Sequence, residues 1–259
     1  MTLPAVSDTF YWSTESWGAA LRCRPLQPIA PHLFTTRDLQ LPSTAGYVAL
    51  ASALNAERVA IVDQVHGRDV VVVREGEAAS AEPHKADALV SDARAIALAV
   101  RAADCVPLLM ADRRTGAVAA VHAGWRGTAA SVAVAAVAAM AREFGTVAAD
   151  LVVAIGPSIG PCCYEVGTEL VDAFAAAGHA RHLVDRWFLA PPPKRGERDR
   201  AKLRLDVPGA NRDQLILAGV NEADIHLSGL CTAEHLDVLT SYRAEKDQAG
   251  RLAAAIRAT

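Results

Sequence analysis

The sequence has few cysteines, little excess charge and no long apolar run, and each shortage excludes a class of protein. Five cysteines among 259 residues are too few for a disulfide scaffold, and an odd count leaves one thiol unpaired, as expected in a reducing cytoplasm. The 26 basic and 29 acidic residues give a net charge of −3, so no overall field attracts nucleic acid or an anionic membrane. An acidic ligand must therefore be held by local arginines or by a metal ion.

The apolar runs are also too short for a membrane span. The longest lies at residues 132–141 and ends at Arg142 and Glu143. The first residues lack the basic and apolar regions of a signal peptide. We therefore expect a cytoplasmic protein with no membrane or nucleic-acid partner, and the sequence leaves the oligomeric state open, with a monomer favoured.

What the sequence does contain is an alternation of short β-rich runs and helical stretches, which is typical of an α/β fold. Strands are predicted at residues 59–62, 70–73, 95–100, 106–110, 117–121 and 151–155. Helices are predicted at residues 128–144, with Thr128 as N-cap and Gly145 as the stop, and at residues 169–177, 211–218 and 248–255. We expect one sandwich-like domain over residues 1–259, with an exposed loop at about residues 190–204.

The most informative segment, residues 101–127, predicts two strands joined by a turn at residues 112–116. If residue 110 or 111 pairs with residue 117, Cys105 lies opposite His122 or nearly so. Opposed side chains are close enough for a thiolate and an imidazole to bind one metal ion, and a shift of one residue in register would separate them. His66, which follows an earlier apolar run, is the third candidate ligand.

Three nitrogen and sulfur ligands with an open fourth position are typical of a catalytic zinc site, and copper is the alternative ion. The spacing is not a short Cys-X-X-Cys pattern, so two other interpretations stay open. Cys105 is then a buried structural cysteine beside hydrogen-bonded histidines, or it forms a nucleophilic pair with a histidine. Cys162 and Cys163 are predicted to be buried rather than a redox pair, because neighbouring residues of a strand face opposite ways. The same alternation turns Asp104 away from Cys105.

Several segments carry longer motifs, in this order along the chain: Asp63-Gln64-Val65-His66-Gly67, Ala103-Asp104-Cys105-Val106-Pro107, His122-Ala123-Gly124-Trp125-Arg126-Gly127, residues 155–166, and Cys231-Thr232 with Ser241-Tyr242-Arg243. Together they resemble the YfiH family, from about Phe34 to Ile256. Members of that family are described both as laccase-like polyphenol oxidases and as purine nucleoside phosphorylases.

The resemblance implies a single αββα-type domain, related to the cysteine-hydrolase-like fold of that family, with zinc held by His66, Cys105 and His122. It implies phosphorolysis of adenosine, inosine, guanosine and methylthioadenosine, with deamination of adenosine alongside. The implied alternatives are copper-dependent oxidation of phenols and hydrolytic editing of peptidoglycan precursors. Laccase chemistry needs several coppers and many histidine ligands, and few of the eight histidines lie in ligand-like motifs.

A phosphorylase must also hold phosphate, and arginine is suited to this because its planar fork matches the phosphate oxygens. Arg37, Arg126 and Arg243 are the candidates, since each lies in a family-like motif. Gln64 is placed with them on the substrate side, and Arg126 joins Cys105 and His122 as a candidate catalytic residue.

The chain departs from the family pattern after Arg37. Relatives follow this arginine with Gly-Gly-Val-Ser and a Ser-Leu-Asn motif, whereas Asp38-Leu39-Gln40 stands here. These residues are expected to form one wall of the substrate site. A change there could alter the nucleoside preference or the use of phosphate while metal binding survives. A non-catalytic protein that keeps the fold is therefore a third interpretation.

Overall fold

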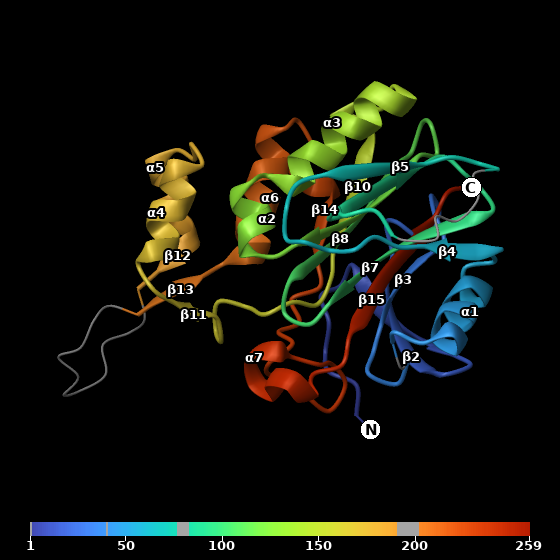
Figure 1. The fold of residues 1–259 in the computed structure, drawn as a ribbon, viewed down its shortest axis with the longest axis horizontal. Helices are drawn as coiled ribbons and strands as arrows, with labels where there is room; N and C mark the ends of the chain where they lie inside the picture. The colour runs from blue at the N-terminus through green and yellow to red at the C-terminus, as the bar shows by residue number, and fades with distance from the viewer. Residues whose placement is uncertain (1, 40, 77–82, 191–201) are drawn as a thin grey trace.

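The computed structural model describes residues 2–39, 41–76, 83–190 and 202–259, and two β-sheets packed face to face form its centre (Figure 1). In this part of the chain, the first six-stranded sheet has the order β1 (Phe10–Glu15), β2 (Gly18–Cys23), β3 (His32–Thr35), β15 (Leu252–Arg257), β7 (Ile96–Ala102) and β4 (Arg58–Ala60). The second has the order β14 (Ile225–Leu227), β10 (Leu151–Ile155), β8 (Val106–Asp112), β9 (Val118–Ala123), β6 (Ala88–Ser91) and β5 (Val70–Val73).

The central strands are buried on both faces, so they are largely apolar. Along β15, Leu252, Ala254 and Ile256 pack between the sheets. Ala253 and Ala255, which alternate with them, pack on the opposite face against α1 (Thr44–Ala53). Strand β8 alternates in the same way, with Leu109 and Ala111 between the sheets and Val106, Leu108 and Met110 facing the helices on its other side.

Helices cover both outer faces, which gives four layers in the order α, β, β, α. The first sheet carries α1, and the second carries α2 (Trp125–Ala129), α3 (Val132–Phe144) and α6 (Val207–Leu217), as Figure 1 shows. The predicted α/β class and the αββα sandwich are therefore confirmed. No helix of the described residues is long and apolar enough to cross a membrane.

The remaining elements extend the sandwich at two places. At one end lie α4 (Glu169–Ala176), α5 (Arg181–Trp187) and a small sheet of β11 (Glu165–Val166), β13 (Leu203–Leu205) and β12 (Phe188–Leu189) (Figure 1). Near the functional motifs lies α7 (Tyr242–Glu245). Short 3₁₀ helices occupy Ala148–Asp150, Glu222–Asp224 and Lys246–Gln248.

Two helix predictions are corrected. The second half of the segment predicted as a helix at residues 248–255 lies in β15, because its alanines favour a helix locally but are buried on both sides in the first sheet. The segment at residues 128–144 is two helices, α2 and α3, separated by Ser131 in the left-handed conformation at φ 60°. Gly145, also left-handed, ends α3 as predicted.

The strand predictions at residues 70–73 and 151–155 match β5 and β10. Most of the predicted loop at residues 190–204 lies outside the described residues. Its last part is not a loop, because Leu203 and Arg204 belong to β13, where Arg204 pairs with Glu165 and Leu189.

Candidate metal and substrate site

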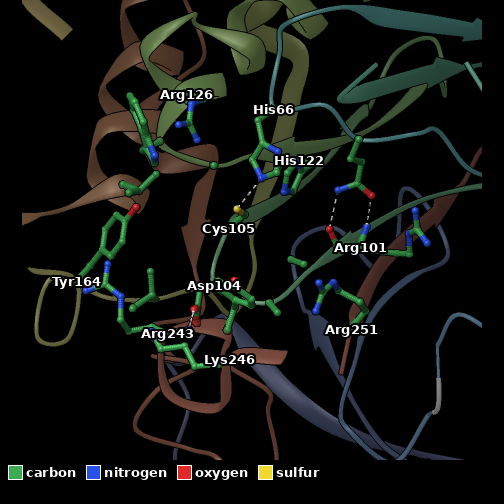
Figure 2. Close-up of a pocket in the computed structure, with 18 of the residues that line it drawn as sticks. His66, Arg101, Asp104, Cys105, His122, Arg126, Tyr164, Arg243, Lys246 and Arg251 are labelled. Carbon is green, nitrogen blue, oxygen red and sulfur yellow. Dashed lines mark hydrogen bonds between the residues drawn. The ribbon is translucent and has the colours of Figure 1, made fainter. Parts of the chain in front are cut away.

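The motifs that resemble the YfiH family meet at one cavity of about 680 Å³ at the end of the β8–β9 hairpin. Cys105 directly precedes β8, and His122 is the penultimate residue of β9. His66 comes from the loop between β4 and β5, in the left-handed conformation at φ 62°. Figure 2 shows the three side chains turned toward one another.

The ligand atoms of these three residues all lie within 4.8 Å of one another. His66 Nε2 is 3.9 Å from Cys105 Sγ, and the two imidazole rings have their centroids 5.0 Å apart, edge to face. A nitrogen, a sulfur and a second nitrogen around one point can hold a metal ion with a position left open. The predicted convergence of His66, Cys105 and His122 is present in the structure.

The hairpin brings them together in a different register from the predicted one. Pro107 pairs with His122 and Val106 with Ala123, so Cys105 lies beyond the end of the ladder rather than opposite His122. The turn is longer than expected because Ala111 pairs with Val118, and the left-handed Gly116 leads into Ala117. Cys105 therefore reaches His122 because of where the segment before β8 places it, and not because the two residues pair across the hairpin.

Asp87, which sequence reasoning missed, organises two of the three candidate ligands. Its carboxylate is fully buried and accepts a hydrogen bond from His122 Nδ1 at 2.8 Å, and from the backbone N–H groups of His66 and Gly67 at 2.9 and 2.6 Å. With Nδ1 engaged, His122 keeps Nε2 for a metal ion, as second-sphere carboxylates commonly arrange. The only signal in the sequence is one acidic residue directly before the apolar strand β6.

The charges around Cys105 favour the thiolate form of its side chain. Burial opposes ionisation of Cys105, but hydrogen bonds and charge from His122 and His66 lower the pKa of its thiol to about 6. Burial likewise opposes the charged form of His122, yet Asp87 and Cys105 raise its pKa to about 9. Because the thiolate is the form that binds metals, Cys105 is prepared for ligation at neutral pH.

Gly124 provides the space that the group requires. A Cβ atom on this residue would lie 2.8 Å from Cys105 Sγ and 3.0 Å from His66 Cδ2, closer than side chains tolerate. The His-Ala-Gly-Trp motif therefore carries a candidate histidine ligand and, two residues later, a glycine that lets the other two candidate ligands approach the turn.

Asp104 connects the two C-terminal motifs to the site by hydrogen bonds. It adopts φ 87°, which is rare for a residue with a side chain, and so does not follow the strand alternation expected for it. Its carboxylate accepts a hydrogen bond from the Thr232 hydroxyl at 2.6 Å and another from the Arg243 backbone N–H at 2.6 Å. These two bonds hold the Cys231-Thr232 and Ser241-Tyr242-Arg243 segments beside Cys105.

Cationic side chains line the rest of the cavity, although the whole chain is slightly acidic. They are Arg101, Arg126, Arg243, Lys246 and Arg251 (Figure 2). Within the described residues, the Arg126 guanidinium lies 4.4 Å from the centroid of the Trp125 ring and has no hydrogen-bond acceptor. Arg243 donates to the Glu165 carbonyl and lies over Tyr164, 4.9 Å from the ring centroid.

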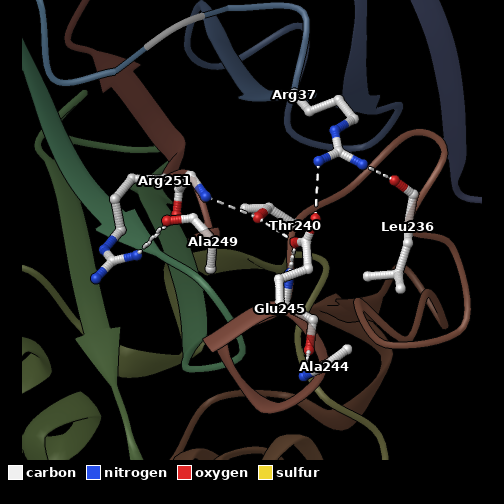
Figure 3. A network of polar contacts seen from close by, with 9 residues as sticks. Arg37, Leu236, Thr240, Ala244, Glu245, Ala249 and Arg251 are labelled. Carbon is white, nitrogen blue, oxygen red and sulfur yellow. Dashed lines mark hydrogen bonds and ion pairs between the residues drawn. The ribbon is translucent and has the colours of Figure 1, made fainter. Parts of the chain in front are cut away.

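Two predicted substrate residues are engaged elsewhere. Gln64 lines the cavity, but its amide donates to the Arg101 carbonyl at 2.7 Å and accepts from the Arg101 N–H at 2.8 Å. Arg37 does not line the cavity. Its guanidinium pairs with Glu245 at 2.8 Å and donates to the Leu236 carbonyl, as Figure 3 shows. Arg251 and Lys246, which do line it, were not predicted, because no motif marks them.

A comparison with known protein families identifies the family of this chain. The family described as multi-copper polyphenol oxidoreductase laccase matches residues 38–259, and the chain belongs to this family. Two solved structures share the fold. YlmD from Geobacillus stearothermophilus has a TM-score of 0.80 at 30% identity, covering 95% of this chain and 98% of that one. YfiH from Bacillus licheniformis has a TM-score of 0.81 at 25% identity, covering 93% and 96%. The predicted resemblance to the YfiH family is confirmed.

Curated relatives are named as enzymes. A Bacteroides thetaiotaomicron protein named purine nucleoside phosphorylase is 36% identical over 67% of this chain and 61% of its own length. Purine nucleoside phosphorylase YlmD of Geobacillus stearothermophilus is 34% identical over 79% of this chain and 73% of its own. Adenosine deaminase RL5, from an unknown prokaryotic organism, is 39% identical over 61% of this chain and 56% of its own.

Proposed function

We propose that the protein is a zinc-dependent purine nucleoside phosphorylase that also deaminates adenosine. The observation that carries this proposal is the meeting of His66, Cys105 and His122 with a cationic wall in one cavity of about 680 Å³. A volume of this size is typical of small-molecule sites. The names of the relatives supply the substrate class, purine nucleosides and phosphate.

The donor set fits a zinc ion. His66, Cys105 and His122 would hold it, and a bound zinc supplies Lewis-acid chemistry and lowers the pKa of water, which suits deamination. The chain's own contribution is positional. Asp87 fixes the orientation of His122, and Gly124 leaves room for Cys105 and His66. The raised pKa of Tyr164, about 12, keeps its hydroxyl protonated in the cavity as a hydrogen-bond donor.

Phosphorolysis breaks the bond between the purine and ribose C1′ and joins C1′ to a phosphate oxygen, so phosphate must be held beside the sugar. Arg126 is the best placed of the predicted phosphate ligands, because its guanidinium is exposed, lines the cavity and lacks an internal acceptor in the described part of the chain. Arg243 has one nitrogen engaged by Glu165 and offers its remaining donors. Arg37 is not included in the proposal.

The test is incubation of the zinc-loaded protein with adenosine, with and without phosphate, and chromatography of the products. Adenine and ribose 1-phosphate formed only with phosphate are expected for phosphorolysis, and inosine for deamination. Cys105→Ala is expected to abolish the products and to remove the zinc held by His66, Cys105 and His122. Full turnover in that variant, or no purine product from a protein that holds zinc, would overturn the proposal.

A matched pair of arginine variants tests the phosphate role separately. Arg126→Ala is expected to raise the KM for phosphate while deamination in phosphate-free buffer is retained. Arg142→Ala, an exposed arginine on α3 that does not line the cavity, is the control and is expected to leave both reactions unchanged.

Copper-dependent phenol oxidation is the second candidate, favoured by the description of the family. Within the described residues, one group with metal-binding geometry contains histidine, whereas laccase chemistry needs several histidine-bound coppers. Oxygen consumption with a phenol and the copper-loaded protein, lost in His122→Ala, would support this candidate. Its absence alongside phosphorolysis would exclude it.

A further inference from the structure

A second sulfur cluster lies outside the site described above. The Sγ atoms of Cys162, Cys163 and Cys231 lie within 4.8 Å of one another, and all three cysteines are free thiols. They come from segments about 70 residues apart in the sequence, so their meeting is produced by the tertiary fold. The prediction that Cys162 and Cys163 are buried is wrong for Cys162, which is exposed, while Cys163 is half-buried.

The backbone fixes this arrangement. Ser158 and Cys231 form a parallel bridge, with the Ser158 N–H donating to the Leu230 carbonyl at 3.2 Å and the Thr232 N–H donating to the Ser158 carbonyl at 3.0 Å. The Gly160 carbonyl accepts hydrogen bonds from the N–H groups of Cys163 and Tyr164, both at 3.0 Å. Cys162 and Cys163 therefore lie in a tight turn rather than a strand, and the alternation that would separate their side chains does not apply.

Gly160 forms the floor of the cluster. Its N–H donates to Cys231 Sγ at 3.3 Å, which orients a sulfur lone pair. A Cβ atom at Gly160 would lie 3.2 Å from Cys162 Sγ and 3.8 Å from Cys231 Sγ, so a side chain here would crowd the space that the sulfurs share. N–H donors to cysteine sulfur stabilise the thiolate form, which is the form that binds metals.

The chemistry of three sulfur donors without oxygen or nitrogen is selective. Thiolates favour soft cations such as Cu⁺, and also Zn²⁺ and Cd²⁺. A tetrahedral ion with metal–sulfur bonds of about 2.3 Å places its sulfurs about 3.8 Å apart, so the cluster needs to contract by about 1 Å at most. Burial and the neighbouring Cys231 raise the pKa of both Cys162 and Cys163, so without a cation these two groups are held as thiols.

We propose that Cys162, Cys163 and Cys231 form a second metal site, separate from the His66, Cys105 and His122 group, that binds a thiophilic cation of the Zn²⁺, Cd²⁺ and Cu⁺ class. Each bound cation displaces up to three thiol protons into solution. Cys162 is the exposed entry to the site, and Cys231 is its buried end. The site is also linked to the cavity, because Thr232, next to Cys231, donates to Asp104 beside Cys105.

Cadmium titration of the reduced, metal-free protein tests this proposal, because thiolate-bound Cd²⁺ has a charge-transfer absorption in the ultraviolet. Wild type is expected to bind two equivalents. Cys105→Ala, which removes a ligand of the first group only, is expected to bind one equivalent with the absorption of a three-thiolate site. Failure of Cys105→Ala to bind any Cd²⁺ against a competing chelator would overturn the proposal.

Two serine variants each remove one sulfur of the cluster at a position outside the buried core. Cys162→Ser, at the exposed position, and Cys163→Ser in the Cys105→Ala background are each expected to weaken Cd²⁺ binding by more than about 100-fold, beyond the cost of altering an outer-sphere partner. Cys23→Ala is the control, because Cys23 is free, buried in β2 and in neither group. Unchanged Cd²⁺ affinity in both serine variants would overturn the proposal.

Protection from alkylation gives an independent readout. In Cys105→Ala, Cd²⁺ is expected to slow modification of Cys162 and Cys163 in the folded protein, measured by mass spectrometry, and to leave Cys23 unaffected. If Cys162 and Cys163 instead react equally fast with and without Cd²⁺, the two thiols are not ligands and the proposal fails. None of these measurements depends on the activity assigned above.

Discussion

The two groups of candidate ligands contain similar sulfur atoms but differ in what surrounds them. Cys105 lies between two imidazoles, backed by the buried Asp87 carboxylate, and the pKa of its thiol is lowered to about 6. Cys162 has other thiols as neighbours, and its pKa is raised. The first group opens into the cationic cavity and the second does not line it. The residues around the sulfur atoms, rather than the cysteines themselves, therefore distinguish the two groups.

The largest expected effect comes from removing the sulfur of the first group. Cys105→Ala leaves two histidines, so we expect the loss of one equivalent of zinc relative to wild type, measured by metal analysis, together with loss of nucleoside turnover. Cys162→Ser is the matched thiol change and is expected to leave zinc at the first group and turnover in place. If Cys162→Ser abolished turnover as well, the separation of the two groups would be wrong.

The difference in thiol pKa gives a pH-dependent test on the metal-free protein. A lowered pKa means that the thiolate is populated at lower pH, so alkylation of Cys105 should reach half its maximal rate near pH 6 instead of the ordinary 9.0. Cys162 should show no such midpoint below pH 9, because its pKa is raised. Rate profiles from mass spectrometry check both, and equal midpoints would contradict the comparison.

Gly124→Ala is expected to weaken the first group by crowding. The added methyl would lie 2.8 Å from Cys105 Sγ, so we expect zinc affinity to fall by about 10- to 100-fold, comparable to the loss of an outer-sphere partner. Gly67→Ala is the control, because its Cβ would make ordinary contacts of 3.6 Å or more. Competitive chelation measures both affinities, and equal losses would show that the space at Gly124 is not what matters.

Asp87→Asn tests the orienting carboxylate with little change in shape. The amide keeps one acceptor oxygen but places its NH2 group against either the Gly67 N–H or the N–H groups of His122 and His66, so zinc affinity should fall by about 10- to 100-fold and the pKa of His122 toward its ordinary value. Asp112→Asn is a matched control, since Asp112 is also buried and accepts backbone N–H groups but has no histidine partner. NMR titration of His122 in the metal-free protein reports the pKa.

How much of this was predictable from the sequence depends on whether the signal was local. The meeting of the three candidate ligands and the α/β sandwich could be predicted, because motif resemblance and apolar runs are carried by consecutive residues. Strand β15 could not, because a strand buried on both faces has no polar alternation, and its alanines favour a helix when considered alone.

The missed site residues were missed for a related reason. Asp87 reaches His122 across a β-ladder, through 35 positions of sequence, and no spacing rule connects them. The Cys162 and Cys163 prediction assumed a strand, where the structure has a turn closed by Gly160. The hairpin register was wrong by one or two residues because the left-handed Gly116 lengthens the turn. Tertiary contacts and turn geometry, rather than composition, decided each case.

The smallest expected effect concerns Arg37, where the sequence and the structure lead to different expectations. Its guanidinium pairs with Glu245 outside the cavity, so Arg37→Ala should leave the KM for phosphate unchanged and lower the free energy of unfolding by about 0–1 kcal/mol, as an exposed ion pair does. Arg126→Ala should raise that KM about 10- to 100-fold, because it removes a charged hydrogen-bond donor from the cavity. If the two variants raised the KM equally, Arg37 would have to reach phosphate through a rearrangement of α7, and the motif would have predicted the role better than the ion pair does.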